Sequence, residues 1–180
     1  MAVAKGMRYE VHVARVLESM LGAAALVVRC GGANDRGVDV LADLGDMSIV
    51  VQCKNFGKRL GPQFVRELEA SVADAQSSAA SWQTLGLLAS PEGFTKQAHL
   101  RAMAAAQPLG LVVLREGDAL PSSLVLNAPA HMRLPQQLTV ARATHEEQCT
   151  ARRAVFPDAS EAVGATAAAS GLVSLHCWRA

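Results

Sequence analysis

The sequence predicts an α/β fold in which a mixed β-sheet is flanked by helices, with the element order α-β-β-β-α-β-α-β. Apolar residues recur at helical spacing in some segments, and short runs of β-branched and small residues separate those segments. Helices alternate with strands only in the second half of the chain, which indicates a mixed sheet rather than a fully parallel one.

The first half is predicted to hold one helix and three strands. Residues 7–21 form an amphipathic helix because their apolar side chains recur every three or four positions, and Gly22 is placed to end it. The strand at 48–54 is apolar almost throughout, so we expect it to be central and buried on both faces. The other expected elements are strands at 24–30 and 37–42, a Gly-Gly-Ala-Asn-Asp loop from residue 31, and a tight turn at 43–47.

The second half is predicted to alternate helices and strands. A basic loop at 56–60 leads into a helix over about 62–76, whose first turn accommodates Pro62. A strand at 84–89, a helix at 95–106 and a strand at 110–114 follow. We expect one domain over residues 1–118 and a C-terminal extension over 119–180. In that extension we expect extended chain at 120–137, a polar helix at 138–155 and a linker at 158–170.

Composition and charge narrow the class of protein only slightly. The 180 residues are 51% hydrophobic, which is enough for one domain with a sizeable core. The formal net charge is +1, but residues 1–66 carry nine Lys/Arg and six Asp/Glu, a net charge of +3, and the remainder carries 8 − 10 = −2. This mild basic bias permits a local anionic ligand without requiring one.

Cysteine usage and hydropathy indicate a soluble intracellular protein. The spacing of the cysteines (Cys30, Cys53, Cys149 and Cys177) argues against a structural zinc site, and free thiols are typical of a reducing compartment. We see neither an apolar run of the ~20 residues that span a bilayer nor a signal peptide. We expect a cytoplasmic location in a prokaryote and a mitochondrial or nuclear one in a eukaryote. The oligomeric state stays open, with a homodimer among the options.

The candidate site lies on the second and third predicted strands. Asp39 lies on the first of these, and Gln52 and Lys54 share a face of the second because side chains alternate along a strand. A carboxylate and neutral oxygens, here Asp39, the Gln52 side chain and the Cys53 backbone carbonyl, are ligands that Mg²⁺ accepts. Metal-dependent phosphodiester cleavage needs such a set, and Lys54 could orient water or stabilise charge at the phosphate.

Two further groups of residues are candidates for the same site. Glu10 lies on the opening helix outside its main apolar stripe, where its carboxylate could complete the site, and Glu18 is a second candidate. A nucleic-acid-binding role is assigned to the basic residues Arg36, Lys58 and Arg59. A lone Asp in a strand and a Gln-x-Lys strand end are also common in purely structural positions. Spacing alone therefore also allows a structural role for these residues.

The order of these motifs resembles the PD-(D/E)xK nuclease superfamily, and within it the Mrr-like catalytic domain of type IV restriction enzymes. The matching motifs are Tyr9-Glu10, Gly37-Val38-Asp39, Gln52-Cys53-Lys54, Val65-Arg66-Glu67-Leu68 and Phe94-Thr95-Lys96-Gln97-Ala98. The resemblance covers residues 6–115. It implies a restriction-endonuclease-like fold, DNA as partner and cleavage that depends on Mg²⁺, with Mn²⁺ as a substitute. Asp39, Gln52 and Lys54 carry over as the active-site triad, and Glu10 as the helix carboxylate.

Two alternatives to a nuclease remain. The chain also resembles a group of fungal mitochondrial proteins required for respiratory growth, in which such a domain is coupled to a poorly characterised tail. A non-catalytic nucleic-acid-binding protein that retains the nuclease fold, or a scaffold in an organellar complex, therefore stays open beside the metal-dependent endonuclease.

Overall fold

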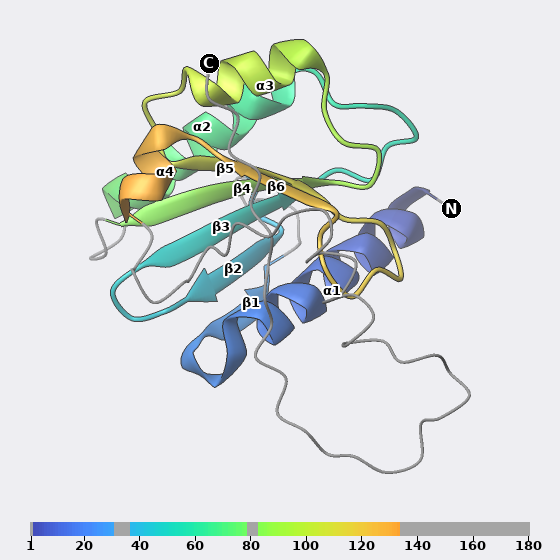
Figure 1. The fold of residues 1–180 in the computed structure, drawn as a ribbon. Coiled ribbons are helices and arrows are strands. Elements are labelled where there is room, and N and C mark those ends of the chain that lie inside the picture. The colour runs from blue at the N-terminus through green and yellow to red at the C-terminus, as the bar shows by residue number, and fades with distance from the viewer. Residues whose placement is uncertain (1, 31–36, 79–82, 134–180) are drawn as a thin grey trace, which may run out of the picture.

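The computed structural model describes residues 2–30, 37–78 and 83–133. They form three layers, with a six-stranded mixed sheet between helices on its two faces (Figure 1). The strands follow the chain order β1 to β6; the β3–β4 and β4–β5 pairs are parallel, and the other neighbouring pairs are antiparallel. The strands are β1 (Leu26–Arg29), β2 (Val40–Asp43), β3 (Ser48–Cys53), β4 (Thr84–Ser90), β5 (Leu109–Val113) and β6 (Ser123–Leu126). The helices are α1 (Ala2–Leu21), η1 (Gly22–Ala24, a 3-10 turn), α2 (Pro62–Ser78), α3 (Lys96–Met103) and α4 (Ala128–Arg133).

This architecture confirms the predicted fold class, and the predicted element order holds from α1 to β5. The largest shift in a strand boundary is at β2, which begins at Val40 rather than at residue 37. The cause is local, because the Cys53 N–H donates to the Asp39 side chain, where a longer β2 would offer a backbone carbonyl. The Gly-rich loop at 31–36 lies outside the described residues.

The sheet continues past residue 118, where the sequence predicts the domain to end. Strand β6 pairs antiparallel with β5, and α4 follows it directly. Strand β6 agrees with the extended chain that we expect at 120–137, whereas α4 contradicts it. The helix forms there because the Asn127 side chain caps it by accepting a hydrogen bond from Ala130 N–H. The predicted polar helix at 138–155 and linker at 158–170 lie outside the described residues.

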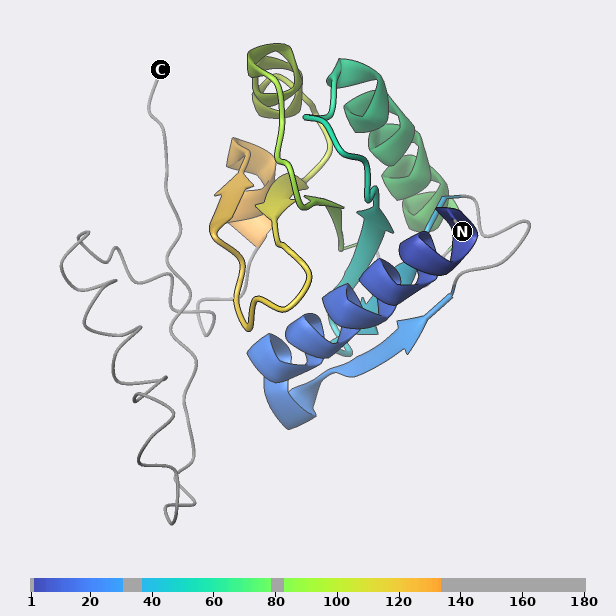
Figure 2. The ribbon, with the colours of Figure 1, turned by 90° about the vertical axis from the view of Figure 1, so that its right-hand side faces the viewer.

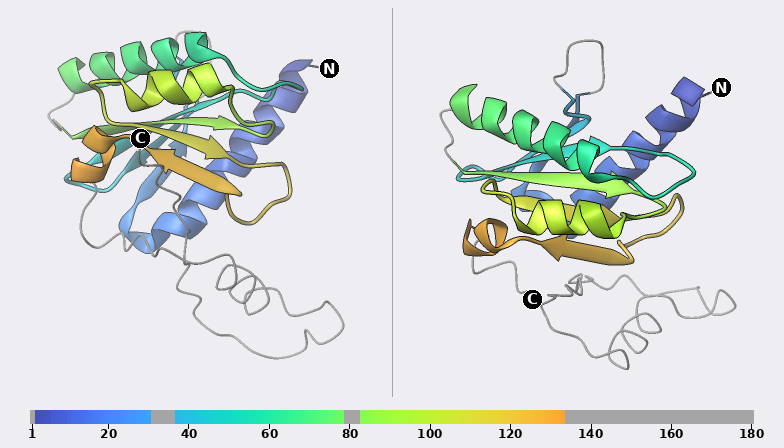
Figure 3. Two further views of the ribbon diagram at one scale, coloured as in Figure 1. Left: turned by 45° about the horizontal axis from the view of Figure 1, so that its top comes forward. Right: turned by 90° about the horizontal axis from the view of Figure 1, so that it is seen from above.

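Each face of the sheet packs against its own hydrophobic core. Helix α1 covers one face (Figure 2), and α2 and α3 lie side by side over the other (Figure 3). In β3, Val51 packs in the α1 core and Val50 packs in the α2 and α3 core, so both faces of this strand are buried as predicted. Because faces alternate, the Cys53 side chain lies on the α1 side, and those of Gln52 and Lys54 belong to the α2 side.

Candidate active site

Asp39 lies where β2 separates from β3 and contacts the end of β3 twice. Its N–H donates to the Val51 carbonyl over 2.9 Å, and its Oδ2 accepts a 2.6 Å hydrogen bond from the Cys53 N–H. The N–H and C=O of one strand residue point to the same side of the strand. The Cys53 carbonyl therefore faces the strand edge at which the Asp39 carboxylate lies.

Gln52 is a buried polar residue at the same strand end. Its side chain belongs to the α2 face, and the residue is only 3% exposed. Its Oε1 has no hydrogen-bond partner within the part of the chain that the structure describes. Leaving such an oxygen unpaired costs about 1–3 kcal/mol, and a water or ion usually satisfies it. The amide oxygen of Gln52 is thus the third oxygen donor at this end of β3.

Lys54 follows Gln52 on the same face and lies over the first turns of α2. Its Nζ is 3.9 Å from Glu67 Oε2 and 5.9 Å from the centre of the Phe64 ring. Half of the Glu67 side chain is exposed, so this ion pair is screened by solvent and holds Lys54 only loosely. The ammonium group is therefore available to an anionic ligand.

Glu10 lies on α1, across the sheet from Gln52 and Lys54. Its Oε2 is 3.1 Å from Nη1 of Arg29 on β1. The neighbouring Tyr9 hydroxyl donates to the Leu114 carbonyl over 2.9 Å and fixes this turn of α1 against β5. Glu18, the second helix candidate, is exposed. Glu10 is thus held near the sheet edge by an ion pair.

The pKa of the Cys53 thiol reports on the charges around it. Burial raises this pKa well above its ordinary value, the negative charges of Asp39 and Glu10 raise it further, and Lys54 opposes them. All three charged groups therefore act on the same end of β3. Burial also raises the pKa of Tyr9, and negative charge at Cys53 and Glu116 raises it further. A neutral thiol and a neutral phenol accordingly line the α1 side.

The basic loop after β3 borders the site. Lys58 and Arg59 are exposed, as the sequence predicts, whereas Arg36 lies outside the described residues. Two backbone hydrogen bonds of 2.9 Å, from Leu60 N–H to Gly93 O and from Thr95 N–H to Leu60 O, fix the end of this loop. Burial lowers the pKa of His99 on α3, and the positive charge of Arg59 lowers it further.

The loop also carries an exposed aromatic side chain. Phe56 is 44% exposed, and its ring lies 5.5 Å from that of Phe64 on α2. An exposed ring beside two cations is a surface that nucleic acids contact readily.

The donor set fits a hard divalent cation better than zinc. Within residues 2–30, 37–78 and 83–133, no three His, Cys, Asp or Glu side chains come together to hold a metal ion. The oxygen donors at the end of β3 are a carboxylate, an amide and a backbone carbonyl, a set that suits Mg²⁺ or Mn²⁺. The structure thus brings Asp39, Gln52, Cys53 and Lys54 to one strand end, with Glu10 close by on the α1 side.

Two serines near the site could not be identified from the sequence. Ser71 is 6% exposed on the inner side of α2, and its hydroxyl lies close to Gly37. Ser90 ends β4 and is fully buried, and its Oγ has no partner among the described residues. Serines in a helix and at a strand end carry no sequence signal for a site, because only the packing of α2 and β4 against β3 brings them there.

No helix in the described part of the chain has the length and apolar character that crossing a membrane requires.

Comparison with known proteins places the chain in one family. A family model described as Required for respiratory growth protein 7 matches residues 1–45 and 41–133. An uncharacterised mitochondrial protein of Schizosaccharomyces pombe (strain 972) is 34% identical over 116 residues, which are 61% of this chain and 44% of the relative. This chain therefore spans less than half the length of that relative.

A solved structure is also similar in part. The MspJI restriction endonuclease in complex with a 27-mer oligonucleotide matches 58% of this chain and 25% of its own, with 18% identity and a TM-score of 0.40. The family model covers most of the chain, including every strand of the described sheet. The protein belongs to the Required for respiratory growth protein 7 family.

Proposed function

We propose that this protein is a metal-dependent endonuclease that hydrolyses phosphodiester bonds in DNA. The observation that carries the proposal is the buried Gln52 Oε1, which has no partner among the described residues, at a strand end that Asp39 and Lys54 share. A fold that leaves a polar atom unpaired in this position loses stability, and a bound ion would restore it.

The metal would be Mg²⁺, with Mn²⁺ as a substitute, held by Asp39, the Gln52 amide oxygen and the Cys53 carbonyl. These are hard oxygen donors, and Mg²⁺ typically keeps several waters beside one or two carboxylates. When bound, the ion would supply Lewis-acid polarisation of the phosphate and a more acidic water. The hydrogen bond from Cys53 N–H to Asp39 Oδ2 holds the carboxylate at this strand end.

The chain's own residues would bind and orient the DNA. Lys54 would donate hydrogen bonds to the scissile phosphate and stabilise the negative charge that develops on it. Lys58 and Arg59, together with Arg36, would contact backbone phosphates on either side. Glu10 would accept a hydrogen bond from water on the α1 side, and Arg29 holds its carboxylate in position. We further place this activity in the mitochondrion, as the description of the fission-yeast relative suggests.

Plasmid cleavage by the full chain tests the proposal. Wild type should nick or cut supercoiled DNA with Mg²⁺ or Mn²⁺ and not with excess EDTA. Lys54→Ala should lower the rate about 100- to 1000-fold because the transition-state charge loses its donor. Asp39→Asn should cost at least as much through the lost metal ligand.

Two variants act as matched controls for this assay. Asp43→Asn changes an exposed carboxylate at the other end of β2, and Lys96→Ala removes an exposed ammonium at the start of α3. Both should retain wild-type rates. If all four variants cut like wild type, or if cleavage persists in EDTA, the nuclease proposal is wrong.

A second candidate function is that of a non-catalytic nucleic-acid-binding protein or scaffold. The small negative charge of the candidate metal site favours it. Of the three candidate ligands at the β3 end, Asp39, Gln52 and the Cys53 carbonyl, Asp39 alone carries a formal charge, and Glu10 is paired with Arg29. This candidate predicts DNA binding that weakens with salt and survives both Asp39→Asn and EDTA. Filter binding at several salt concentrations distinguishes the two.

A further inference from the structure

A metal can use the Gln52 side chain only if its amide presents oxygen rather than nitrogen. Unlike a carboxylate, a carboxamide has one acceptor and one donor end, and a rotation of half a turn exchanges them. We propose that Ser71, together with Gly37, is a positioning residue that fixes this orientation, with Nε2 turned toward them and Oε1 toward the metal site. The inference rests on the function proposed above, since it concerns the same metal site.

The first observation is the space beside Gly37. This glycine has φ +77°, and a Cβ built on it would lie 2.9 Å from Gln52 Nε2 and 3.5 Å from Ser71 Oγ. The amide nitrogen and the serine hydroxyl therefore border the same small volume, which is open because residue 37 has no side chain. Any larger residue there would push the amide away and would also strain the backbone.

The second observation is the direction of the Ser71 hydroxyl. Its Oγ donates a 3.1 Å hydrogen bond to the Glu67 carbonyl, so its proton points along α2. Toward Gly37 the hydroxyl therefore presents oxygen lone pairs, which favour an N–H donor and repel a second carbonyl. Gln52 Nε2 is placed on that side, and Oε1, which has no partner within the described residues, is left for the site.

The third observation is the register between α2 and β3. Glu67 and Ser71 are one turn apart on α2, and Lys54 and Gln52 are two residues apart on β3. Both separations are about 6 Å. Glu67 contacts Lys54, and Ser71 and the Gln52 amide both border the position of Gly37. The same face of α2 thus carries the neighbour of Lys54 and the hydroxyl nearest to the space beside the Gln52 amide.

Mn²⁺ titration of the full chain without DNA tests the inference, followed by calorimetry or by the electron paramagnetic resonance of free Mn²⁺. Ser71→Ala should weaken Mn²⁺ binding about tenfold or more, as losses of groups that orient metal ligands typically do. Ser77→Ala is the matched control, because Ser77 also lies on α2 and donates to a helix carbonyl, that of Asp74, over 2.8 Å. The control should bind Mn²⁺ as wild type does, and both variants should keep the wild-type melting temperature.

Ser71→Ala in a Gln52→Glu background distinguishes a loss of amide orientation from a general disturbance of the metal site. Both oxygens of a carboxylate accept, so its rotation no longer matters, and Ser71→Ala should then weaken binding by less than about twofold. An equal loss in both backgrounds, or no loss in either, overturns the role of Ser71 and leaves the metal site standing. A wild-type chain that binds no Mn²⁺ overturns both the inference and the proposed function.

Discussion

At the scale of single residues, two cysteines near Asp39 differ in environment. Cys30 is exposed, and its N–H donates to the Asp39 carbonyl over 2.8 Å. The Cys53 thiol has a raised pKa, because burial and the charges of Asp39 and Glu10 disfavour the thiolate. The thiolate is the reactive form of cysteine, so the two positions should react at very different rates.

Thiol labelling checks this difference. In variants that keep a single cysteine and carry serine at the other three positions, Cys30 should react with a disulfide reagent within minutes at about pH 8. Cys53 should react in the folded protein at least about 100-fold more slowly and reach the Cys30 rate only in denaturant. Equal rates in the folded protein would show that Cys53 is not held neutral at the end of β3.

The residues of the site differ in how far the sequence could predict them. Gln52 and Lys54 could be placed on one face, because strand alternation depends only on spacing. The burial of the Gln52 amide, whose oxygen has no partner among the described residues, could not be predicted, since it results from how α2 packs over β3. Ser71 could not be predicted for the same reason. A buried serine in a helix indicates a role only when its neighbours on the strand are known.

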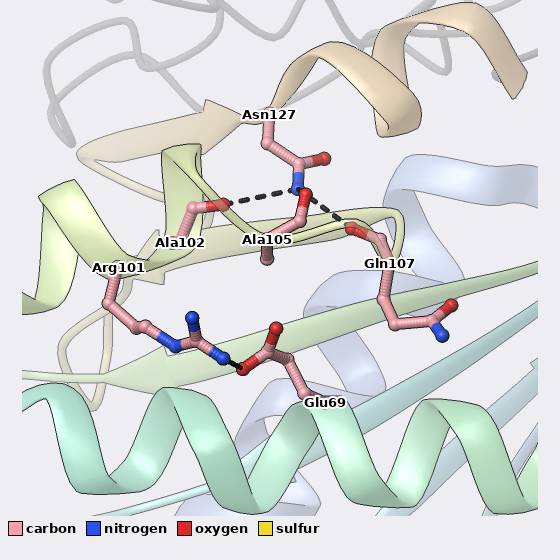
Figure 4. A network of polar contacts seen from close by, with 6 residues as sticks. All are labelled: Glu69, Arg101, Ala102, Ala105, Gln107 and Asn127. Atoms are coloured by element: carbon pink, nitrogen blue, oxygen red, sulfur yellow. Dashed lines mark hydrogen bonds and ion pairs between the residues drawn. The ribbon is translucent and has the colours of Figure 1, made fainter.

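At the scale of elements, Asn127 connects β6 and α4 to the rest of the sheet (Figure 4). The residue is 1% exposed, and its Nδ2 donates to the carbonyls of Ala102, Ala105 and Gln107 over 2.7–3.3 Å. Its Oδ1 accepts from the N–H groups of Leu109 and Ala130, both at 3.0 Å. One side chain thus joins the end of α3, the start of β5 and the start of α4.

Replacing Asn127 should therefore destabilise the whole fold. Asn127→Ala should lower the free energy of unfolding by about 2–4 kcal/mol, because several buried backbone groups lose their partner. Asn127→Asp should cost at least as much, since a carboxylate would face three carbonyl oxygens. Urea unfolding measures both, and Ser122→Ala, which removes an exposed hydroxyl bonded to the Val113 carbonyl, is the control. An Asn127→Ala protein as stable as the control would contradict the role of this network.

An ion pair between Arg101 on α3 and Glu69 on α2 also joins these two helices over the sheet (Figure 4). The long helices and the parallel strands could be predicted, because their apolar periodicity extends over many residues. The four-residue β6 and the six-residue α4 could not, because each is too short for a periodic pattern and their position depends on Asn127.

At the scale of the whole molecule, the family model spans the entire described sheet. It matches to residue 133 and includes both β6 and α4. The sheet separates two hydrophobic cores. The candidate site lies where β2 separates from β3, at a strand end that side chains from both faces of the sheet approach. The fold class could be predicted because it follows from the order of elements, whereas the metal and the reaction remain proposals.

Diffraction from crystals of the full chain soaked in Mn²⁺ tests the central claim most directly. The account predicts one anomalous peak at the end of β3, with an Asp39 carboxylate oxygen, Gln52 Oε1 and the Cys53 carbonyl each within about 2.0–2.5 Å of it. Crystals of Asp39→Asn soaked in the same way should lose the peak. A peak elsewhere, or a fully soaked crystal with none at this strand end, would contradict the assignment of the site.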